Sequence, residues 1–138
     1  MITQIPPTAL SLTDPTTTLQ TYLETLPKPL YIFFIASPDP ITNTPWCPDV
    51  RRAIPVVERV FTAHDEELLV VTVEVGGKDV WKGDNVFKSE WGITAIPTLG
   101  KYSIVTIEGQ NIVAVRMLVE NDCADEQKLQ SFITSDVE

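Results

Sequence analysis

One cysteine of this chain lies where an extended segment gives way to a helix. It is Cys47, in the segment Trp46–Val50, which has the sequence Trp-Cys-Pro-Asp-Val. Pro48 suits the first position of a helix, and the carboxylate of Asp49 suits the positive end of the helix dipole. Cys47 therefore lies at or just before the N-cap, where unpaired backbone N–H groups favour a thiolate over a thiol. A thiolate is the nucleophile that thiol–disulfide exchange requires.

The position three residues after Cys47 lacks a second thiol. In a Cys-x-x-Cys redox motif that position carries the resolving cysteine, and here it holds Val50. The backbone N–H of Val50 can still donate to the Cys47 sulfur from the first turn of the helix. The sequence thus predicts one activated thiol without the second half of a dithiol cycle.

Four further pieces of the sequence accompany this motif. They are Pro55-Val56-Val57, Val75-Gly76, Trp81-Lys82 and Ile96-Pro97-Thr98-Leu99. Together with Trp46-Cys47-Pro48-Asp49, they resemble the thioredoxin domain-containing protein 17 family, whose signature is Trp-Cys-Pro-Asp-Cys. The resemblance extends from about Leu30 to the C-terminus. It implies an α/β, thioredoxin-like fold, in which helices flank a central mixed β-sheet.

The resemblance also implies a function. The family reduces small disulfides and selected protein disulfides with electrons from thioredoxin reductase. Because Val50 cannot resolve a mixed disulfide, glutathione or another protein thiol must complete the cycle here. We therefore expect a monothiol oxidoreductase of the protein-disulfide reductase type, in which Cys47 attacks small disulfides, glutathione adducts or selected protein disulfides. Glutathione and thioredoxin reductase are its candidate partners.

A second class of function stays open, namely a redox-inactive binding module of the same fold. Such a module would hold an extended peptide or a thiol-bearing partner with Pro97, Trp46 and the strand edge. The polar segment from Ser37 to Pro45 should overhang the site in either case. In the family that this chain resembles, a similar overhanging loop narrows the range of substrates.

Two residues far along the chain would face the thiol. In thioredoxin-like folds the proline at the position of Pro97 is cis, which leaves the backbone of Ile96 free to pair with a bound substrate. From the sequence alone, Pro97 could equally be an ordinary proline at the start of a strand. The resemblance favours the cis form.

The other candidate site residues each have a structural alternative. Trp46 and Pro48 flank the thiol, and we expect them to contact the substrate. Trp81 is either a further contact or a core residue. Asp49 is either a catalytic residue that shuttles a proton for Cys47 or only a favourable charge in the first helical turn.

The second cysteine, Cys123, follows the second strand of an expected hairpin, which returns the chain to the rim where Cys47 and Pro97 lie. It is either a partly buried residue of the groove wall or a replacement resolving thiol. The second role would require Cα atoms within about 7 Å of each other. One histidine and two distant cysteines do not form a zinc site, so we expect neither a metal nor a cofactor.

The composition limits the partners. The net charge of −9, from 10 basic and 19 acidic residues, makes nucleic acid and anionic membrane surfaces unfavourable partners, because both are polyanions. No apolar run approaches the length of a membrane span, and the N-terminal residues do not resemble a secretion signal. We expect a cytoplasmic, monomeric protein.

A length of 138 residues suits one domain. We expect an irregular arm over residues 1–14, with at most a short edge strand near Thr3 to Ile5, and one thioredoxin-like domain over residues 15–138. Hydrophobic periodicity and turn residues predict its elements. They are a helix from Asp14 to Leu26, a buried strand from Leu30 to Ala36, a long helix after Cys47 with Pro55 inside it, a buried strand from Leu68 to Val75, a short helix from Asn85 to Trp91, a hairpin of Thr98 to Ile104 with Gln110 to Val119, and a last helix that starts within Asp122 to Asp125.

Overall fold

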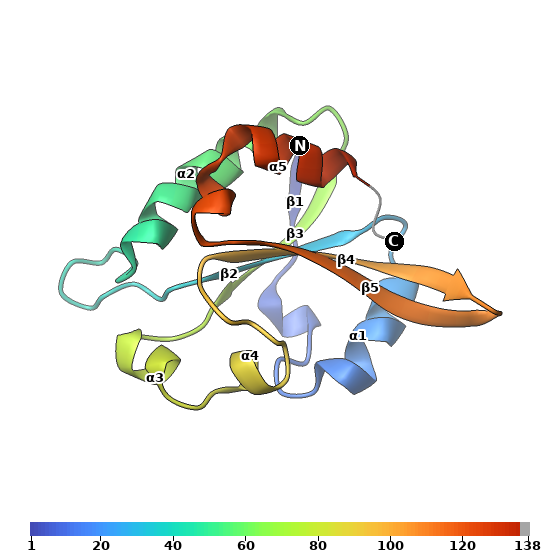
Figure 1. The fold of residues 1–138 in the computed structure, drawn as a ribbon, viewed down its shortest axis with the longest axis horizontal. Helices are drawn as coiled ribbons and strands as arrows, with labels where there is room; N and C mark the ends of the chain where they lie inside the picture. The colour runs from blue at the N-terminus through green and yellow to red at the C-terminus, as the bar shows by residue number, and fades with distance from the viewer. Residues whose placement is uncertain (136–138) are drawn as a thin grey trace.

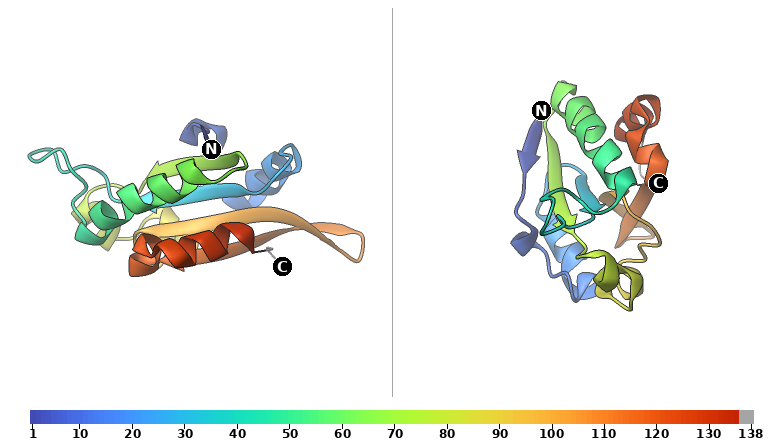
Figure 2. Two further views of the ribbon diagram at one scale, coloured as in Figure 1. Left: turned by 90° about the horizontal axis from the view of Figure 1, so that it is seen from above. Right: turned by 90° about the vertical axis from the view of Figure 1, so that its left-hand side faces the viewer.

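The computed structural model describes residues 1–135, so residues 136–138 of the expected domain lie outside the described part. A five-stranded mixed sheet forms its centre, in the order β1-β3-β2-β4-β5. Helices α2 and α5 cover one face of the sheet, and α1, α3 and α4 lie on the other (Figure 1). Figure 2 shows the same layers from two further sides.

The strands are β1 (Ile2–Gln4), β2 (Leu30–Ile35), β3 (Leu68–Glu74), β4 (Thr98–Ile107) and β5 (Gln110–Val119). The helices are η1 (Pro7–Ala9), α1 (Pro15–Glu24), α2 (Pro48–Ala63), α3 (Lys78–Lys82), α4 (Val86–Ser89), η2 (Glu120–Ala124) and α5 (Glu126–Thr134), where η marks a 3₁₀ helix.

Strand β2 is the centre of the sheet. All six of its residues are buried, because helices cover both faces, and this explains its uninterrupted apolar sequence. It runs parallel to β3 and antiparallel to β4, with Phe34 opposite Thr98. This register brings Pro97, which precedes β4, to the end of β2 from which the chain leaves toward Cys47.

Helix α2 carries the candidate thiol at its first end. Its inner face is a buried stripe of Val50, Ala53, Val57, Val60 and Phe61. Burial of each Val or Phe side chain contributes about 1.5–3 kcal/mol, so this stripe fixes the helix on the sheet. As the sequence predicts, Pro55 lies inside the helix, where it removes one backbone hydrogen bond.

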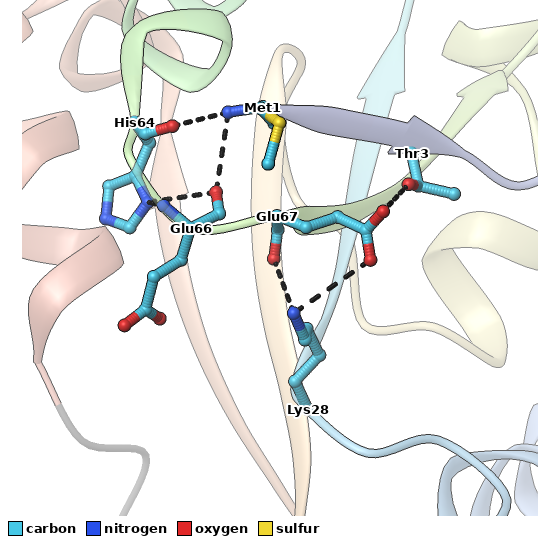
Figure 3. Close-up of polar contacts among 6 residues, drawn as sticks. All are labelled: Met1, Thr3, Lys28, His64, Glu66 and Glu67. Carbon is cyan, nitrogen blue, oxygen red and sulfur yellow. Dashed lines mark hydrogen bonds and ion pairs between the residues drawn. The ribbon is translucent and has the colours of Figure 1, made fainter.

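The other end of α2 is bound to the N-terminus of the chain (Figure 3). The Met1 ammonium group donates hydrogen bonds to the carbonyls of Phe61 and Thr62, each at 3.2 Å, and to those of His64 and Glu66. A cation is favourable at the negative end of a helix. The residues after Met1 form β1, which pairs in parallel with β3. The expected edge strand is thus present at Ile2–Gln4, and it makes this part of the arm the outer strand of the sheet.

Helix α5 is joined to the sheet by a buried lysine of β4. Lys101 is 4% exposed, and its Nζ donates to the carbonyls of Phe132 at 3.3 Å and Ile133 at 2.9 Å near the end of α5. Burial of an ammonium group is unfavourable unless it is hydrogen-bonded. These carbonyls supply the acceptors, and α5 is thereby positioned against β4.

The β4–β5 hairpin is longer than the sequence indicates. Strand β4 continues to Ile107, and a two-residue turn of Glu108 and Gly109 connects it to β5. Both turn residues have positive φ, 52° and 78°, which is the geometry that lets long hairpin strands stay paired. The apolar pattern weakens near the turn because this part of the hairpin is exposed.

Helix α3 lies between the predicted strand that ends at Val75 and the predicted helix that begins at Asn85, in a stretch for which the sequence predicts no regular element. Gly77 and Gly83 cap this five-residue helix, and Asp79 and Lys82 complement its dipole. These end signals were available, but five residues are too few to show a helical period. Within residues 1–135, no helix is both long and apolar enough to cross a membrane.

Candidate active site

Cys47 is the N-cap residue of α2, with Pro48 at the first helical position, as the sequence predicts. Its side chain is half-buried. The sulfur makes no capping hydrogen bond to the first turn of the helix and lies instead 4.0 Å from the carbonyl oxygen of Ile96. The expected bond from the Val50 N–H is therefore absent. A thiol is a weak acceptor and can donate to a carbonyl, which explains the orientation.

The Ile96–Pro97 peptide bond is cis, in agreement with the resemblance. Pro97 and the side chain of Ile96 are buried. Among the described residues, neither the N–H nor the C=O of Ile96 bonds to another backbone group, and the carbonyl meets only the Cys47 thiol. An unpaired backbone beside a thiol can offer hydrogen bonds to a peptide or peptide-like substrate.

Val50 is completely buried and belongs to the core stripe of α2. A branched hydrocarbon thus occupies the place of a resolving thiol, with its side chain away from solvent. Cys47 is consequently the one partly exposed thiol among the described residues. Any covalent chemistry at this site proceeds through that single sulfur.

Trp46 is held in place by a contact that sequence reasoning did not find. Its indole Nε1 donates to the carbonyl of Gly76 at 2.9 Å. The same carbonyl accepts a hydrogen bond from the Ser37 N–H at 3.2 Å, and the Ser37 hydroxyl accepts one from the Gly76 N–H at 3.0 Å. Gly76 has φ +103°, a conformation that favours glycine. The Val75-Gly76 motif was a signal for this contact, although the sequence assigns it no role.

The segment from Ser37 to Pro45 forms a compact loop that projects from the thiol end of the molecule (Figure 2). A bridge between Pro38 and Pro45 closes its base. At its tip, the Asp39 carboxylate accepts a hydrogen bond from the Ile41 N–H at 2.8 Å, and the Ile41 residue is 91% exposed. The loop ends next to Trp46, and its overhang of the site stays a prediction.

Two arginines follow the thiol on α2. Arg52 forms an ion pair with the Asp49 carboxylate one turn before it. Arg51 extends back toward the loop, where its Nη1 donates to the Pro45 carbonyl at 2.5 Å. The charge of Asp49 is therefore offset by Arg52, which favours a role in the helix start over proton transfer to Cys47.

Cys123 is completely buried and lies close to Pro97. Its Sγ donates to the Leu118 carbonyl at 3.3 Å and lies 3.8 Å from the Pro97 carbonyl. The pKa of the Cys123 thiol is raised from 9.0 to about 12, mainly by burial; a backbone hydrogen bond from Leu99 opposes this shift, and the charge of Asp122 adds a smaller contribution that raises the pKa. A buried, protonated thiol is a poor nucleophile, so the structure favours the groove-wall alternative.

Trp81 is only 8% exposed, and the Lys88 ammonium group lies 4.8 Å from its ring centroid. It is a buried residue of α3 and belongs to the hydrophobic core. This position fits the core alternative and leaves little of the ring for a substrate.

A mixed sheet of this order, with a cysteine at the start of α2 and a cis-proline facing it, defines a protein of the thioredoxin fold. Solved structures agree on the fold. A thioredoxin from Fasciola hepatica superimposes with a TM-score of 0.51 at 18% identity, over 89% of this chain and 94% of that chain. A thioredoxin from Nicotiana alata gives a TM-score of 0.52 at 17% identity, over 94% and 89% of the two chains.

Within that class, the chain belongs to the thioredoxin domain-containing protein 17-like family, whose thioredoxin domain model matches residues 9–134. It is 42% identical over 105 residues to a thioredoxin domain-containing protein of Schizosaccharomyces pombe. The matched region covers 75% of this chain and 82% of the relative. It is 29% identical over 110 residues to human thioredoxin domain-containing protein 17, covering 79% and 80%. The recognition from the Trp-Cys-Pro-Asp motif is confirmed.

Proposed function

We propose that this protein is a monothiol thiol–disulfide oxidoreductase that acts through Cys47. One observation carries the proposal: a half-buried thiol at the N-cap of α2 faces the unpaired backbone of Ile96 at a cis-proline. The N–H groups of Asp49 and Val50 are the free donors at this end of the helix, since Pro48 has none. They are available to stabilise the negative charge of the Cys47 thiolate before it attacks.

The proposed reaction has two exchange steps. The Cys47 thiolate attacks one sulfur of a disulfide, so that a Cys47–substrate disulfide forms, the original S–S bond breaks, and the departing thiolate takes a proton from solvent. Because Val50 offers no second thiol, an external thiolate such as glutathione then attacks the substrate sulfur of the mixed disulfide. The external thiol and the bound half of the substrate leave together as a new disulfide, and the Cys47 thiolate is regenerated.

The groove supplies binding rather than proton transfer. The backbone of Ile96 offers one N–H and one C=O to an extended substrate, and Pro97 keeps this edge unpaired. Trp46, which is hydrogen-bonded to Gly76, and Pro48 flank the sulfur in the sequence and are the side chains that would contact a bound substrate. The reducing cytosol, where we expect the protein, contains the thiols that the second step needs.

The test is the reaction of the reduced protein with oxidised glutathione, followed by mass spectrometry of the intact chain and its peptides. We expect one glutathione adduct, located on Cys47, and its removal by reduced glutathione. Cys47→Ser should form no adduct, while Cys123→Ala should behave as the wild type does. A protein that stays unmodified under conditions that label a free cysteine peptide would refute the proposal.

The complete burial of Val50 favours one other candidate, a binding module that has lost turnover. In that case the groove at Ile96 and Pro97 would hold an extended partner without covalent exchange. The same experiment separates the two functions, because a binding module would not release its adduct to reduced glutathione at a rate above that of a free cysteine peptide.

A further inference from the structure

The charges around Cys47 differ from those of the protein as a whole. The chain has a net charge of −9, so its average field repels an anionic ligand. Near the thiol, the only carboxylate in the first turn of α2 is that of Asp49, and Arg52 is paired with it. Within residues 1–135, Arg51 is left as a cation without an opposing carboxylate.

Arg51 is positioned and accessible. Its backbone N–H donates to the Cys47 carbonyl at 3.1 Å, so the two residues lie one helical turn apart, where Cβ atoms are about 5–6 Å from each other. Its Nη1 is tied to the Pro45 carbonyl at 2.5 Å, which holds the guanidinium on the loop side of the thiol. Among the described residues, no carboxylate lies within ion-pair distance of it. A guanidinium has five N–H donors, so this contact leaves donors free.

We propose that Arg51 is a specificity-determining residue, and that it selects small disulfides that carry a carboxylate near the sulfur. This inference rests on the proposed function. A carboxylate one turn from the attacked sulfur can accept hydrogen bonds from the free guanidinium donors, while Ile96 pairs with the peptide-like part of the same ligand. The guanidinium stabilises the bound anionic disulfide and does not take part in electron transfer.

The test measures the second-order rate of mixed-disulfide formation at Cys47 with three disulfides. Oxidised glutathione carries carboxylates, bis(2-hydroxyethyl) disulfide is neutral, and cystamine is cationic. For Arg51→Gln relative to wild type, we expect the rate with oxidised glutathione to fall about two- to fivefold, which is the size of an exposed ion pair in water. The rate with the neutral disulfide should stay the same, and the rate with cystamine should rise.

Three controls separate local from general effects. Arg59→Gln changes the net charge equally at the far end of α2, next to Glu126, and should change no rate. Arg51→Lys retains the charge and should retain most of the preference. Raising the salt to about 1 M, where the Debye length is about 3 Å, should reduce the wild-type preference.

The outcomes distinguish this inference from the proposed function. If the protein reacts with all three disulfides and Arg51→Gln slows them equally or not at all, Arg51 does not select carboxylates, although the oxidoreductase remains. If Arg59→Gln changes the three rates in the same way as Arg51→Gln, the preference for anionic disulfides arises from the net charge of the protein and not from Arg51. If the wild type reacts with none of the disulfides, the proposed function fails and this inference fails with it.

Discussion

Replacing Val50 with cysteine should restore a dithiol site. Val50 is completely buried at the third helical position, three residues after Cys47, which is the Cys-x-x-Cys spacing. A buried Val-to-Cys change removes little volume, and we expect a loss of about 0.5–1.5 kcal/mol in the free energy of unfolding of the reduced protein. The new thiol should form a reversible disulfide with Cys47, with a reduction potential between about −270 and −120 mV, the range of such motifs.

The assay counts free thiols after equilibration in glutathione redox buffers, acid quenching and alkylation under denaturing conditions. The wild type has two cysteines, both free, so Val50→Cys has three when reduced, and only Cys123 should remain free when it is oxidised. Val50→Ala is the matched control, because it has the smaller side chain without the thiol. Consumption of NADPH with thioredoxin reductase should rise in the cysteine variant alone.

Two results would refute this reasoning. If the variant keeps three free thiols in the most oxidising buffer, the two side chains do not meet, and the start of α2 differs from that of a dithiol protein. If the disulfide forms but no NADPH is consumed beyond the wild-type rate, the surface that a reductase recognises has diverged together with the thiol.

Three further predictions concern the residues around the site. Trp46→Phe keeps a ring beside the thiol but loses the hydrogen bond to the Gly76 carbonyl. The free energy of unfolding measured in urea should therefore fall by about 0.5–1.5 kcal/mol, and Cys47 should form its glutathione adduct more slowly. Unchanged stability would contradict a stabilising role of this hydrogen bond. Because burial raises the pKa of Cys123 from 9.0 to about 12, its contribution to stability is complete below pH 9 and is lost as the pH rises toward 12. Urea unfolding at several pH values should show this loss, and Cys123→Ala should make it less steep; an equal slope in both proteins would be inconsistent with a buried thiol. In Gly100→Ala the added Cβ would lie 2.4 Å from the Tyr102 ring, which should cost about 1–3 kcal/mol in thermal unfolding, whereas Gly77→Ala, with nothing within 4 Å of the new atom, should lose less.

Local sequence was sufficient for the start of α2 and for most elements. The Cys47-Pro48-Asp49 order specifies an N-cap, a first helical position and a favourable charge, all within three residues. The uninterrupted apolar run of β2 predicted a strand covered on both faces, because the burial pattern of a strand appears directly in its sequence. Element ends differed by a few residues, and α3 was missed, because short segments carry too little periodicity.

Tertiary structure alone decided what surrounds the thiol. The Cys47 sulfur meets the carbonyl of Ile96 across 49 positions of sequence, and Trp46 reaches Gly76 across 30. No local pattern encodes such contacts, because they depend on the register that places β4 beside β2 and on the loops that leave the same end of the sheet. The same register buries Cys123 against the Pro97 carbonyl. The sequence left the roles of the two thiols open. Their different exposure arises only when the strands pair, and it leaves Cys47 half-buried while Cys123 is completely buried with a raised pKa.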